Sequence, residues 1–218
     1  LGTAGFNDLK PFVESNRKKI CEILNLNYSN IINPEQKHTD NIKIVSGIND
    51  DISNTDGVIT VQPHLVLLLL FADCTPIILY SAIDRVIGVI HAGWRGTAKE
   101  IVKKAAQIFN QQFNVEYKNI KAAIGPAIGQ CCYPVSEDVA YQLQTSISNK
   151  KHKIFKKVEN NATFKVDLKM LNARQLIEIG VTNIDIMDDC TSCNNSIFYS
   201  YRANNGQTGR HGAIASLN

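Results

Sequence analysis

Residues 65–97 have the sequence LVLLLLFADCTPIILYSAIDRVIGVIHAGWRGT, in which three apolar segments are separated by short polar connections. The three segments are Leu65–Ala72, Pro76–Tyr80 and Val86–His91. They do not alternate between apolar and polar residues, as a strand with one solvent-exposed face would. The stretch therefore predicts neighbouring strands that are buried on both faces.

Further strands and helices are expected on both sides of this stretch. Short β-rich runs predict strands at Ile42–Val45, Val58–Val61, Ile120–Ile124, Phe164–Val166, Ile184–Met187, Ile197–Tyr201 and Gly212–Leu217. Apolar residues at helical spacing predict helices over Asn7–Leu26, Thr97–Phe113 and Leu168–Ile179, and another that begins at Ser136. Because strands and helices do not alternate strictly, we predict an α+β fold of mixed β-sheets flanked by helices.

The composition is that of an average globular protein, with 218 residues, 44% of them hydrophobic. At about 150 residues per domain, we expect residues 1–218 to form a single domain. A net charge of +3 is too small to indicate binding to nucleic acid or to an anionic membrane. The first residues, Leu1–Gly5, lack the features of a secretory signal, and Leu65–Ala72 is too short to span a bilayer. We therefore expect a cytoplasmic protein with reduced thiols.

Cys74 and His91 flank the second and third predicted strands. If these strands pair as a hairpin about Asp84, the two side chains lie at the same end of the sheet. A thiolate beside an imidazole is either a nucleophile with its base or a pair of zinc ligands. His38 is a candidate third ligand, and two histidines with one thiolate leave the fourth position open to water or substrate. The residues alone leave both alternatives open.

Three arginines lie in segments that can bind an anion. Arg95 belongs to the glycine-rich turn His91–Gly96, which leads into a predicted helix and can hold a phosphate with its backbone N–H groups. An equally good interpretation is a tight connection with Trp94 in the core. Arg202 and Arg210 flank a glycine-containing loop, where they serve a substrate anion or cap a surface loop.

Four further cysteines match metal or redox motifs only in part. Cys190 and Cys193 form a Cys-x-x-Cys pair, but Cys131 and Cys132 are adjacent. A zinc finger requires a second spaced pair. We therefore interpret these four residues as buried or incidental thiols.

Several short motifs occur in an order that resembles a known protein family. They are Ala72-Asp-Cys-Thr-Pro76, His91-Ala-Gly-Trp-Arg-Gly96, Ile124-Gly-Pro-Ala-Ile128, Cys132-Tyr-Pro-Val135, Cys190-Thr191, Tyr199-Ser-Tyr-Arg202 and Thr208-Gly-Arg210. With them the chain, from Ser15 to its end, resembles the laccase-domain family of purine nucleoside phosphorylases. The names polyphenol oxidase and peptidoglycan editing factor are also used for this family.

The resemblance implies a cytoplasmic zinc enzyme that acts on purine nucleosides and inorganic phosphate. The implied activities are phosphorolysis of adenosine, inosine, guanosine and methylthioadenosine, and deamination of adenosine. The metal ligands of the family correspond to His38, Cys74 and His91. The implied fold is similar to the catalytic domain of cytotoxic necrotizing factor.

Further site roles are hypotheses. Asp73 adjoins Cys74 and is a candidate proton carrier or support for the metal site, while Arg95, Arg202 and Arg210 are candidates for holding phosphate. The chain departs from the family pattern at two places. The glycine- and serine-rich N-terminal motif is absent or degenerate in residues 1–10, and residue 203 is alanine where a second arginine is common.

Histidine content argues against laccase chemistry, because multicopper sites use many histidines, typically as His-x-His pairs. This chain has five histidines and no such pair. Copper can still occupy a thiolate–imidazole site adventitiously, since it outcompetes zinc for such ligands. Two alternatives to the nucleoside enzyme stay open. One is a hydrolase with Cys74 as nucleophile and His91 as base that edits a peptidoglycan precursor, and the other is a non-enzymatic zinc-binding partner protein.

Overall fold

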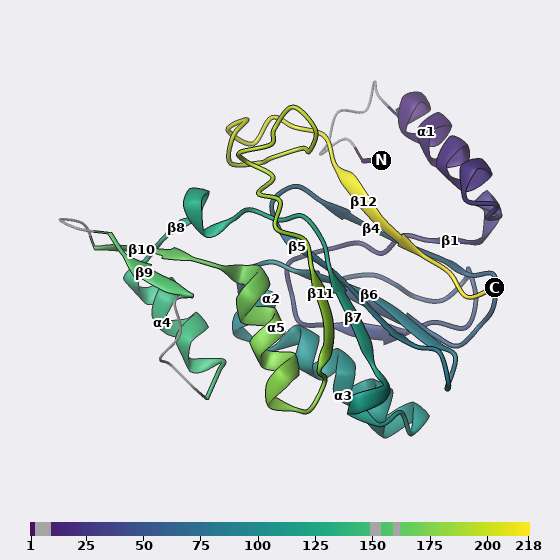
Figure 1. Cartoon of the computed structure of the whole chain (residues 1–218). Helices are drawn as coiled ribbons and strands as arrows, with labels where there is room; N and C mark the ends of the chain where they lie inside the picture. Colours follow the sequence, from purple (N-terminus) through teal and green to yellow (C-terminus); the bar gives the residue numbers. More distant parts are fainter. Residues whose placement is uncertain (3–9, 149–153, 159–161) are drawn as a thin grey trace.

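A six-stranded mixed sheet organises the computed structural model, which describes residues 1–2, 10–148, 154–158 and 162–218 (Figure 1). In spatial order its strands are β11 (Asn183–Ile186), β7 (Lys121–Ile124), β5 (Thr75–Ser81), β6 (Val86–Ala92), β3 (Gly57–Thr60) and β2 (Ile42–Ile44). The central pairs are antiparallel, whereas the outer pairs β7–β11 and β2–β3 are parallel. Helices and strands do not alternate along the chain, and the predicted α+β fold is confirmed.

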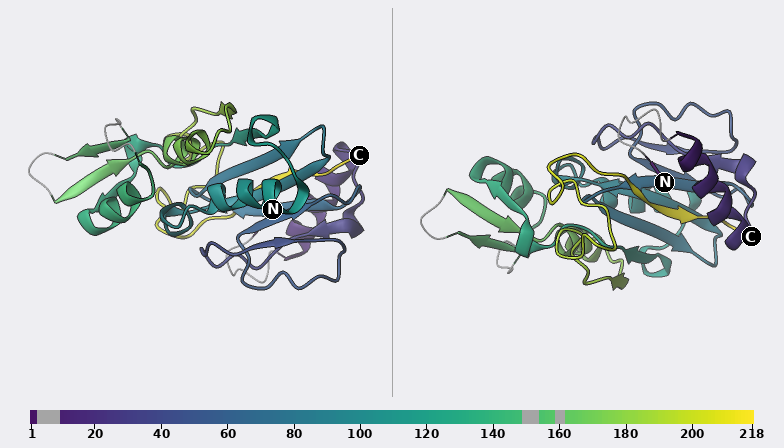
Figure 2. Two further views of the ribbon diagram at one scale, coloured as in Figure 1. Left: turned by 90° about the horizontal axis from the view of Figure 1, so that it is seen from below. Right: turned by 90° about the horizontal axis from the view of Figure 1, so that it is seen from above.

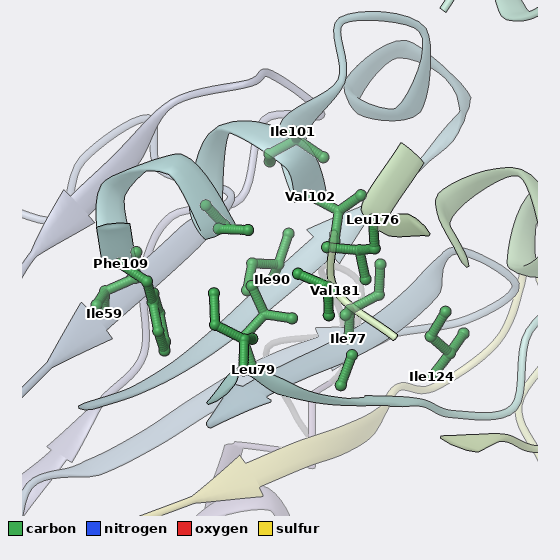
Figure 3. Packing of buried hydrophobic residues seen from close by; sticks show 14 of the residues in the cluster. Ile59, Ile77, Leu79, Ile90, Ile101, Val102, Phe109, Ile124, Leu176 and Val181 are labelled. Atoms are coloured by element: carbon green, nitrogen blue, oxygen red, sulfur yellow. The ribbon is translucent and has the colours of Figure 1, made fainter. Parts of the chain in front are cut away.

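Three helices cover one face of this sheet, namely α2 (Trp94–Ala98), α3 (Ile101–Phe113) and α5 (Leu168–Glu178) (Figure 1). The apolar face of α3 is directed at the sheet, and Val102 and Phe109 pack with Ile77 and Leu79 of β5 (Figure 3). All four side chains are fully buried. Burial of such side chains stabilises the fold by about 1.5–3 kcal/mol each, so this layer is a main source of stability.

A second sheet covers the opposite face. It consists of β1 (Ile31–Ile32), β4 (Val66–Phe71) and β12 (His211–Ala215), with β4 in the middle. Leu67 and Leu69 of β4 share an apolar cluster with Ile87 and Val89 of β6. Because β6 faces helices on one side and this sheet on the other, all its residues are buried. The prediction of strands buried on both faces is confirmed.

A third, smaller sheet extends from one end of the molecule (Figure 2). Its strands are β8 (Pro134–Ser136), β10 (Thr163–Val166) and β9 (Phe155–Lys157), and α4 (Glu137–Thr145) packs against it. The predicted helix from Ser136 is confirmed, with Ser136 as its N-terminal capping position. This lobe has its own apolar cluster, which includes the partly buried Trp94.

The N-terminal helix is only partly as predicted. In the described chain α1 spans Lys10–Ile23, and residues 7–9 of the predicted helix lie outside the described residues. Phe12 and Ile23, two of the apolar residues whose spacing predicts the helix, are 66% and 68% exposed, and Cys21 is the buried residue of the helix. Short 3-10 helices at Tyr28–Asn30 (η2), Tyr117–Asn119 (η3) and Gln130–Cys132 (η4) complete the elements. Across the described ranges, every helix falls short of what a bilayer crossing requires in length and apolar character.

One other prediction is correct only in part, and one is wrong. The helix predicted over Thr97–Phe113 begins at Trp94 and is divided into α2 and α3, because Glu100 adopts a left-handed backbone conformation with φ +60°. The strand predicted at Ile197–Tyr201 is irregular chain between turns. Its N–H groups are used locally, since those of Ile197 and Phe198 both donate to the carbonyl of Asn194.

Candidate metal centre and cavity

The candidate site lies along one edge of the six-stranded sheet. Strand β5 begins at Thr75, which pairs with Ala92 at the end of β6, so Cys74 and His91 emerge together. The hairpin predicted about Asp84 is confirmed. Asp56 precedes β3 at the same edge, because Gly57 pairs with Ile90 of β6.

The structure brings together the three residues predicted as ligands. The side-chain ligand atoms of His38, Cys74 and His91 all lie within 4.8 Å of one another, and we call this group the ligand trio. The two imidazole rings meet edge to face, with centroids 4.9 Å apart. His38 is exposed, Cys74 is half-buried and His91 is buried. The trio is therefore buried in the protein at His91 and accessible at His38.

Asp56 organises the ligand trio. This residue is not among those predicted from the sequence. Its fully buried carboxylate accepts hydrogen bonds from Nδ1 of His91 at 2.8 Å and from the backbone N–H of His38 at 3.0 Å. It also accepts hydrogen bonds from the backbone N–H groups of Lys37 and Thr39 and from the Thr39 hydroxyl. Burial would by itself raise the pKa of Asp56, but the hydrogen bonds from His91 and Thr39 outweigh it and lower the pKa to about 2.

Cys74 and His91 stabilise each other in their charged forms. Burial opposes ionisation of the Cys74 thiol, but the positive charge of His91 and a hydrogen bond with His38 lower its pKa to about 6. Burial likewise opposes charge on His91, yet the Cys74 thiolate and the hydrogen bond with Asp56 raise its pKa to about 9. At neutral pH, and without a metal ion, the pair is therefore a thiolate and an imidazolium.

The chemistry of the ligand trio fits a divalent transition metal. Imidazole and thiolate are the ligands that zinc and copper prefer. The carboxylate of Asp56 holds Nδ1–H of His91, which leaves Nε2 free to bind a metal, as in the carboxylate–histidine pairs of known metal sites. Three protein ligands leave one position of a tetrahedral ion open, which is typical of catalytic rather than structural zinc.

A cavity of about 750 Å³ opens above the ligand trio. Its volume lies within the range of small-molecule sites. Besides the trio, its lining includes three aromatic residues and three arginines, which are Trp94, Tyr133, Tyr201, Arg95, Arg202 and Arg210. All three arginines singled out from the sequence thus reach the same cavity.

The arginines differ in how they are held. The guanidinium carbon of Arg95 lies 4.4 Å from the ring centroid of Trp94, and that of Arg202 lies 5.4 Å from the ring of Tyr133. Stacking on an aromatic ring leaves the edge of a guanidinium group available for an anion. Arg210 instead donates from Nη1 to the carbonyls of residues 208 and 209, so one of its donors is used within its own loop.

Asp73 holds two chain segments in place. Its Oδ1 accepts a hydrogen bond from the hydroxyl of Thr191 at 2.6 Å, and its Oδ2 accepts one from the backbone N–H of Arg202 at 2.7 Å. Its backbone is left-handed, with φ +84°, and its carbonyl accepts from the N–H of Ile128. These contacts place Arg202 at the cavity, beside the residue that precedes Cys74.

The turn from His91 to Gly96 contributes space as well as side chains. A Cβ atom at Gly93 would lie 3.1 Å from Sγ of Cys74 and 3.2 Å from Cδ2 of His38. A side chain at this position would therefore have to displace Cys74 or His38 by a few tenths of an ångström, and glycine avoids this crowding of the ligand trio. Trp94 is half-buried, and it lines the cavity while it also packs against the smaller lobe.

Comparison with known proteins shows the family. Residues 2–218 match the family described as "Multi-copper polyphenol oxidoreductase laccase". The chain belongs to this family. The family resemblance inferred from the sequence motifs is confirmed.

Relatives of this laccase-type family match nearly the whole chain. A purine nucleoside phosphorylase, YlmD of Geobacillus stearothermophilus, is 32% identical over 209 residues, which are 91% of this chain and 76% of the relative. The solved structure of YlmD from Geobacillus stearothermophilus superposes with a TM-score of 0.90 over 99% of this chain and 85% of that chain, at 31% identity. The hypothetical protein YfiH of Bacillus licheniformis superposes with a TM-score of 0.91 at 31% identity, with the same two coverages.

The family description names copper and laccase activity. Because multicopper sites use many histidines, the positions of the histidines in this chain test whether that description fits it. Of its five histidines, two belong to the ligand trio. His64 is exposed, and His152 lies outside the described residues. His211 stacks near Phe71, and burial lowers its pKa to about 4. Within the described ranges, two candidate metal groups occur, and the trio is the one that contains histidine.

Proposed function

We propose that the protein is a metal-dependent purine nucleoside enzyme whose reactions take place in the cavity above the ligand trio. The observation that carries this proposal is the arrangement of His38, Cys74 and His91 on the wall of a cavity that three arginines and three aromatic residues also line. Relatives named as purine nucleoside phosphorylases support the substrate class. We expect adenosine, inosine, guanosine and methylthioadenosine as substrates for phosphorolysis.

In phosphorolysis, an oxygen of inorganic phosphate forms a bond with the anomeric carbon of the ribose, and the bond from that carbon to the purine nitrogen breaks. The purine leaves with a proton, and ribose 1-phosphate is the second product. Arg95 and Arg202 present guanidinium groups to the cavity and are suited to hold the phosphate. Trp94, Tyr133 and Tyr201 offer aromatic surface to the purine.

His38, Cys74 and His91 would hold the metal, and zinc is the ion that we propose. When bound, zinc supplies Lewis-acid polarisation and activation of water, which would also serve the deamination of adenosine. Asp56 fixes the orientation of His91, and Asp73 positions Arg202. Both oxygens of Asp73 already accept hydrogen bonds, so we favour a supporting role over that of a proton carrier.

We propose that residues 1–218 act as one unit in a reducing compartment such as the cytoplasm, since all six cysteines are free. The fold similarity to the catalytic domain of cytotoxic necrotizing factor remains a prediction. So does the interpretation of residues 1–10 as a segment in which the N-terminal motif of the family is absent or degenerate. Copper would fit the same imidazole and thiolate ligands, and we regard its binding as adventitious. Nucleic acid is not a proposed partner.

A second candidate function is a cysteine hydrolase that edits a peptidoglycan precursor. It is favoured by one arrangement, in which Cys74 lies beside His91 and the carboxylate of Asp56 orients that imidazole; the charge of His91 lowers the pKa of the Cys74 thiol. A thiolate, an imidazole and a carboxylate in this order form a nucleophilic triad. Such an enzyme would need no metal ion.

The decisive experiment measures hypoxanthine released from inosine with phosphate present or omitted. The proposal expects release only with phosphate, its loss on chelation and its recovery on addition of zinc. Peptidoglycan-precursor hydrolysis that survives chelation and is abolished by thiol alkylation would favour the hydrolase. Retention of metal without turnover of any nucleoside or precursor would favour a zinc-binding partner protein.

A further inference from the structure

Four cysteines gather at a second place on the molecule. The Sγ atoms of Cys131, Cys132, Cys190 and Cys193 all lie within 4.8 Å of one another, and we call them the cysteine cluster. Sγ of Cys193 lies 3.6 Å from that of Cys131 and 3.4 Å from that of Cys132. Four thiolates bound at about 2.3 Å to one tetrahedral ion have sulfur atoms about 3.8 Å apart. The cluster therefore has the dimensions of a site for a single metal ion.

The fold brings these cysteines together through two neighbouring parallel strands. Ile124 at the end of β7 is in register with Ile186 at the end of β11. The segments that follow these two strands therefore leave the sheet at the same edge. An isolated bridge between Ala127 and Cys190 keeps the two segments side by side. Both cysteine pairs then lie in tight turns, one in η4 and the other in the turns that follow residue 189.

The surrounding backbone stabilises negative charge on one sulfur of the cluster, that of Cys190. The N–H of Gly129 donates to Sγ of Cys190 at 3.1 Å, and N–H donors stabilise a negative sulfur. A Cβ atom on Gly129 would lie 3.2 Å from Sγ of Cys131 and 3.1 Å from Cβ of Cys190. A larger residue at this position would therefore have to push the side chains of Cys131 and Cys190 aside by a few tenths of an ångström.

We propose that Cys131, Cys132, Cys190 and Cys193 bind a single zinc ion in a closed, structural site. All four residues are free cysteines, and four sulfur ligands in tetrahedral arrangement select zinc over magnesium, calcium or manganese. Four protein ligands leave no position for substrate, in contrast to the ligand trio. When zinc binds, each cysteine of the cluster that still carries a proton releases it to solvent. The step therefore requires no oxidant or reductant.

The zinc ion would fix part of the cavity wall. The segment with Cys131 and Cys132 contains Ile128, whose N–H donates to the carbonyl of Asp73 at 2.9 Å. The segment with Cys190 and Cys193 contains Thr191, whose hydroxyl donates to the carboxylate of Asp73 at 2.6 Å. An ion that joins both segments therefore holds Asp73 from two sides, next to Cys74 of the ligand trio.

Zinc content of the purified protein tests the proposal without reference to activity. In a Cys74→Ala background, which removes the ligand trio, we expect one zinc ion per chain after reduction and addition of zinc alone. Addition of the exposed Cys131→Ser and Cys193→Ser substitutions should abolish this zinc. The matched control Cys21→Ala, in helix α1, should retain it. Zinc content that does not differ between the Cys131→Ser/Cys193→Ser variant and this control would overturn the proposal.

A second measurement uses the unsubstituted cluster and does not depend on how the serine variants fold. X-ray absorption of zinc in the Cys74→Ala protein should show four sulfur ligands at about 2.3 Å. Chelation of this zinc should lower the melting temperature. Nitrogen or oxygen ligands in the spectrum would contradict the proposal. So would a Cys132–Cys193 or Cys131–Cys193 disulfide in protein kept under reductant.

Discussion

Oδ1 of Asp56 lies 2.8 Å from Nδ1 of His91, and the same oxygen accepts the backbone N–H of His38. One buried carboxylate thus positions the ring of one ligand and the chain of another. Second-sphere carboxylates of this kind typically change metal affinity by about 10–100-fold. Asp56 is therefore the residue whose replacement tests most directly how the trio is built.

Asp56→Asn should weaken zinc binding at the ligand trio by about 10–100-fold, because an amide cannot stabilise His91 as a carboxylate does. The affinity is measured by competition with a chromogenic chelator in the Cys131→Ser/Cys193→Ser background, so that one site is titrated. Asp50→Asn is the matched control, since Asp50 is only half-buried and accepts hydrogen bonds only within its own loop at Ser46 and Gly47 among the bonds of the described chain. Equal affinities of the two variants would exclude the role given to Asp56.

Zinc binding at the trio should release about one proton near neutral pH. Cys74, with a pKa of about 6, is already a thiolate there, whereas His91, with a pKa of about 9, must lose its proton to bind. Between these two values the apparent affinity should rise about tenfold per pH unit. Below the pKa of Cys74 the dependence should be steeper, because the Cys74 thiol must then also lose its proton, and above that of His91 it should level off. Calorimetry in buffers of different ionisation enthalpy counts the protons, and a count near zero at neutral pH would contradict the assigned charges.

Arg202→Ala should raise the KM for phosphate by about tenfold or more, since a hydrogen bond to a charged group contributes about 1.5–3 kcal/mol. The KM for the nucleoside should change much less. Arg85→Ala is the control, because Arg85 lies at the opposite end of the β5–β6 hairpin and donates to the C-terminal carbonyl of Asn218. Initial rates at varied phosphate and fixed inosine distinguish the two constants. An equal change in both constants would argue against a phosphate-holding role.

Phe109→Ala should lower the free energy of unfolding by about 3–5 kcal/mol, because it leaves a cavity between α3 and the large sheet. Phe12→Ala makes the same substitution in α1, where the side chain is 66% exposed, and should change stability by less than about 0.5 kcal/mol. Urea denaturation of both variants provides the comparison. Similar losses would show that α1 packs more closely than its exposure indicates.

The sequence predicts contacts that are local or that follow from apolar patterning. Cys74 and His91 were placed together because they flank one hairpin, and His38 followed from its residue type. Asp56 was not found, because its approach to His91 depends on the register of β3 against β6, for which the sequence has no signal. The cysteine cluster was missed for a similar reason. Its two halves meet through a parallel pairing of strands that lie far apart in the sequence.

Other differences arise from individual backbone conformations. Nothing in the apolar spacing of residues 97–113 indicates that Glu100 adopts a left-handed conformation and divides the helix. The run at residues 197–201 has the composition of a strand, yet the adjoining N–H of Arg202 is bound by the carboxylate of Asp73. This contact, together with the local hydrogen bonds of Ile197 and Phe198 to Asn194, overrides the strand propensity of the run.

The β5–β6 hairpin also determines the order in which the trio is assembled during folding. Its turn joins strands that are adjacent in the chain, so little loop entropy is lost when Cys74 meets His91. His38 joins the other two ligands only after β2 pairs with β3. This parallel pairing closes a longer loop than the turn of the β5–β6 hairpin. Two of the three ligands should therefore lie together before His38 arrives, and pulse-labelled hydrogen exchange should show amides of β5 and β6 protected before those of β2.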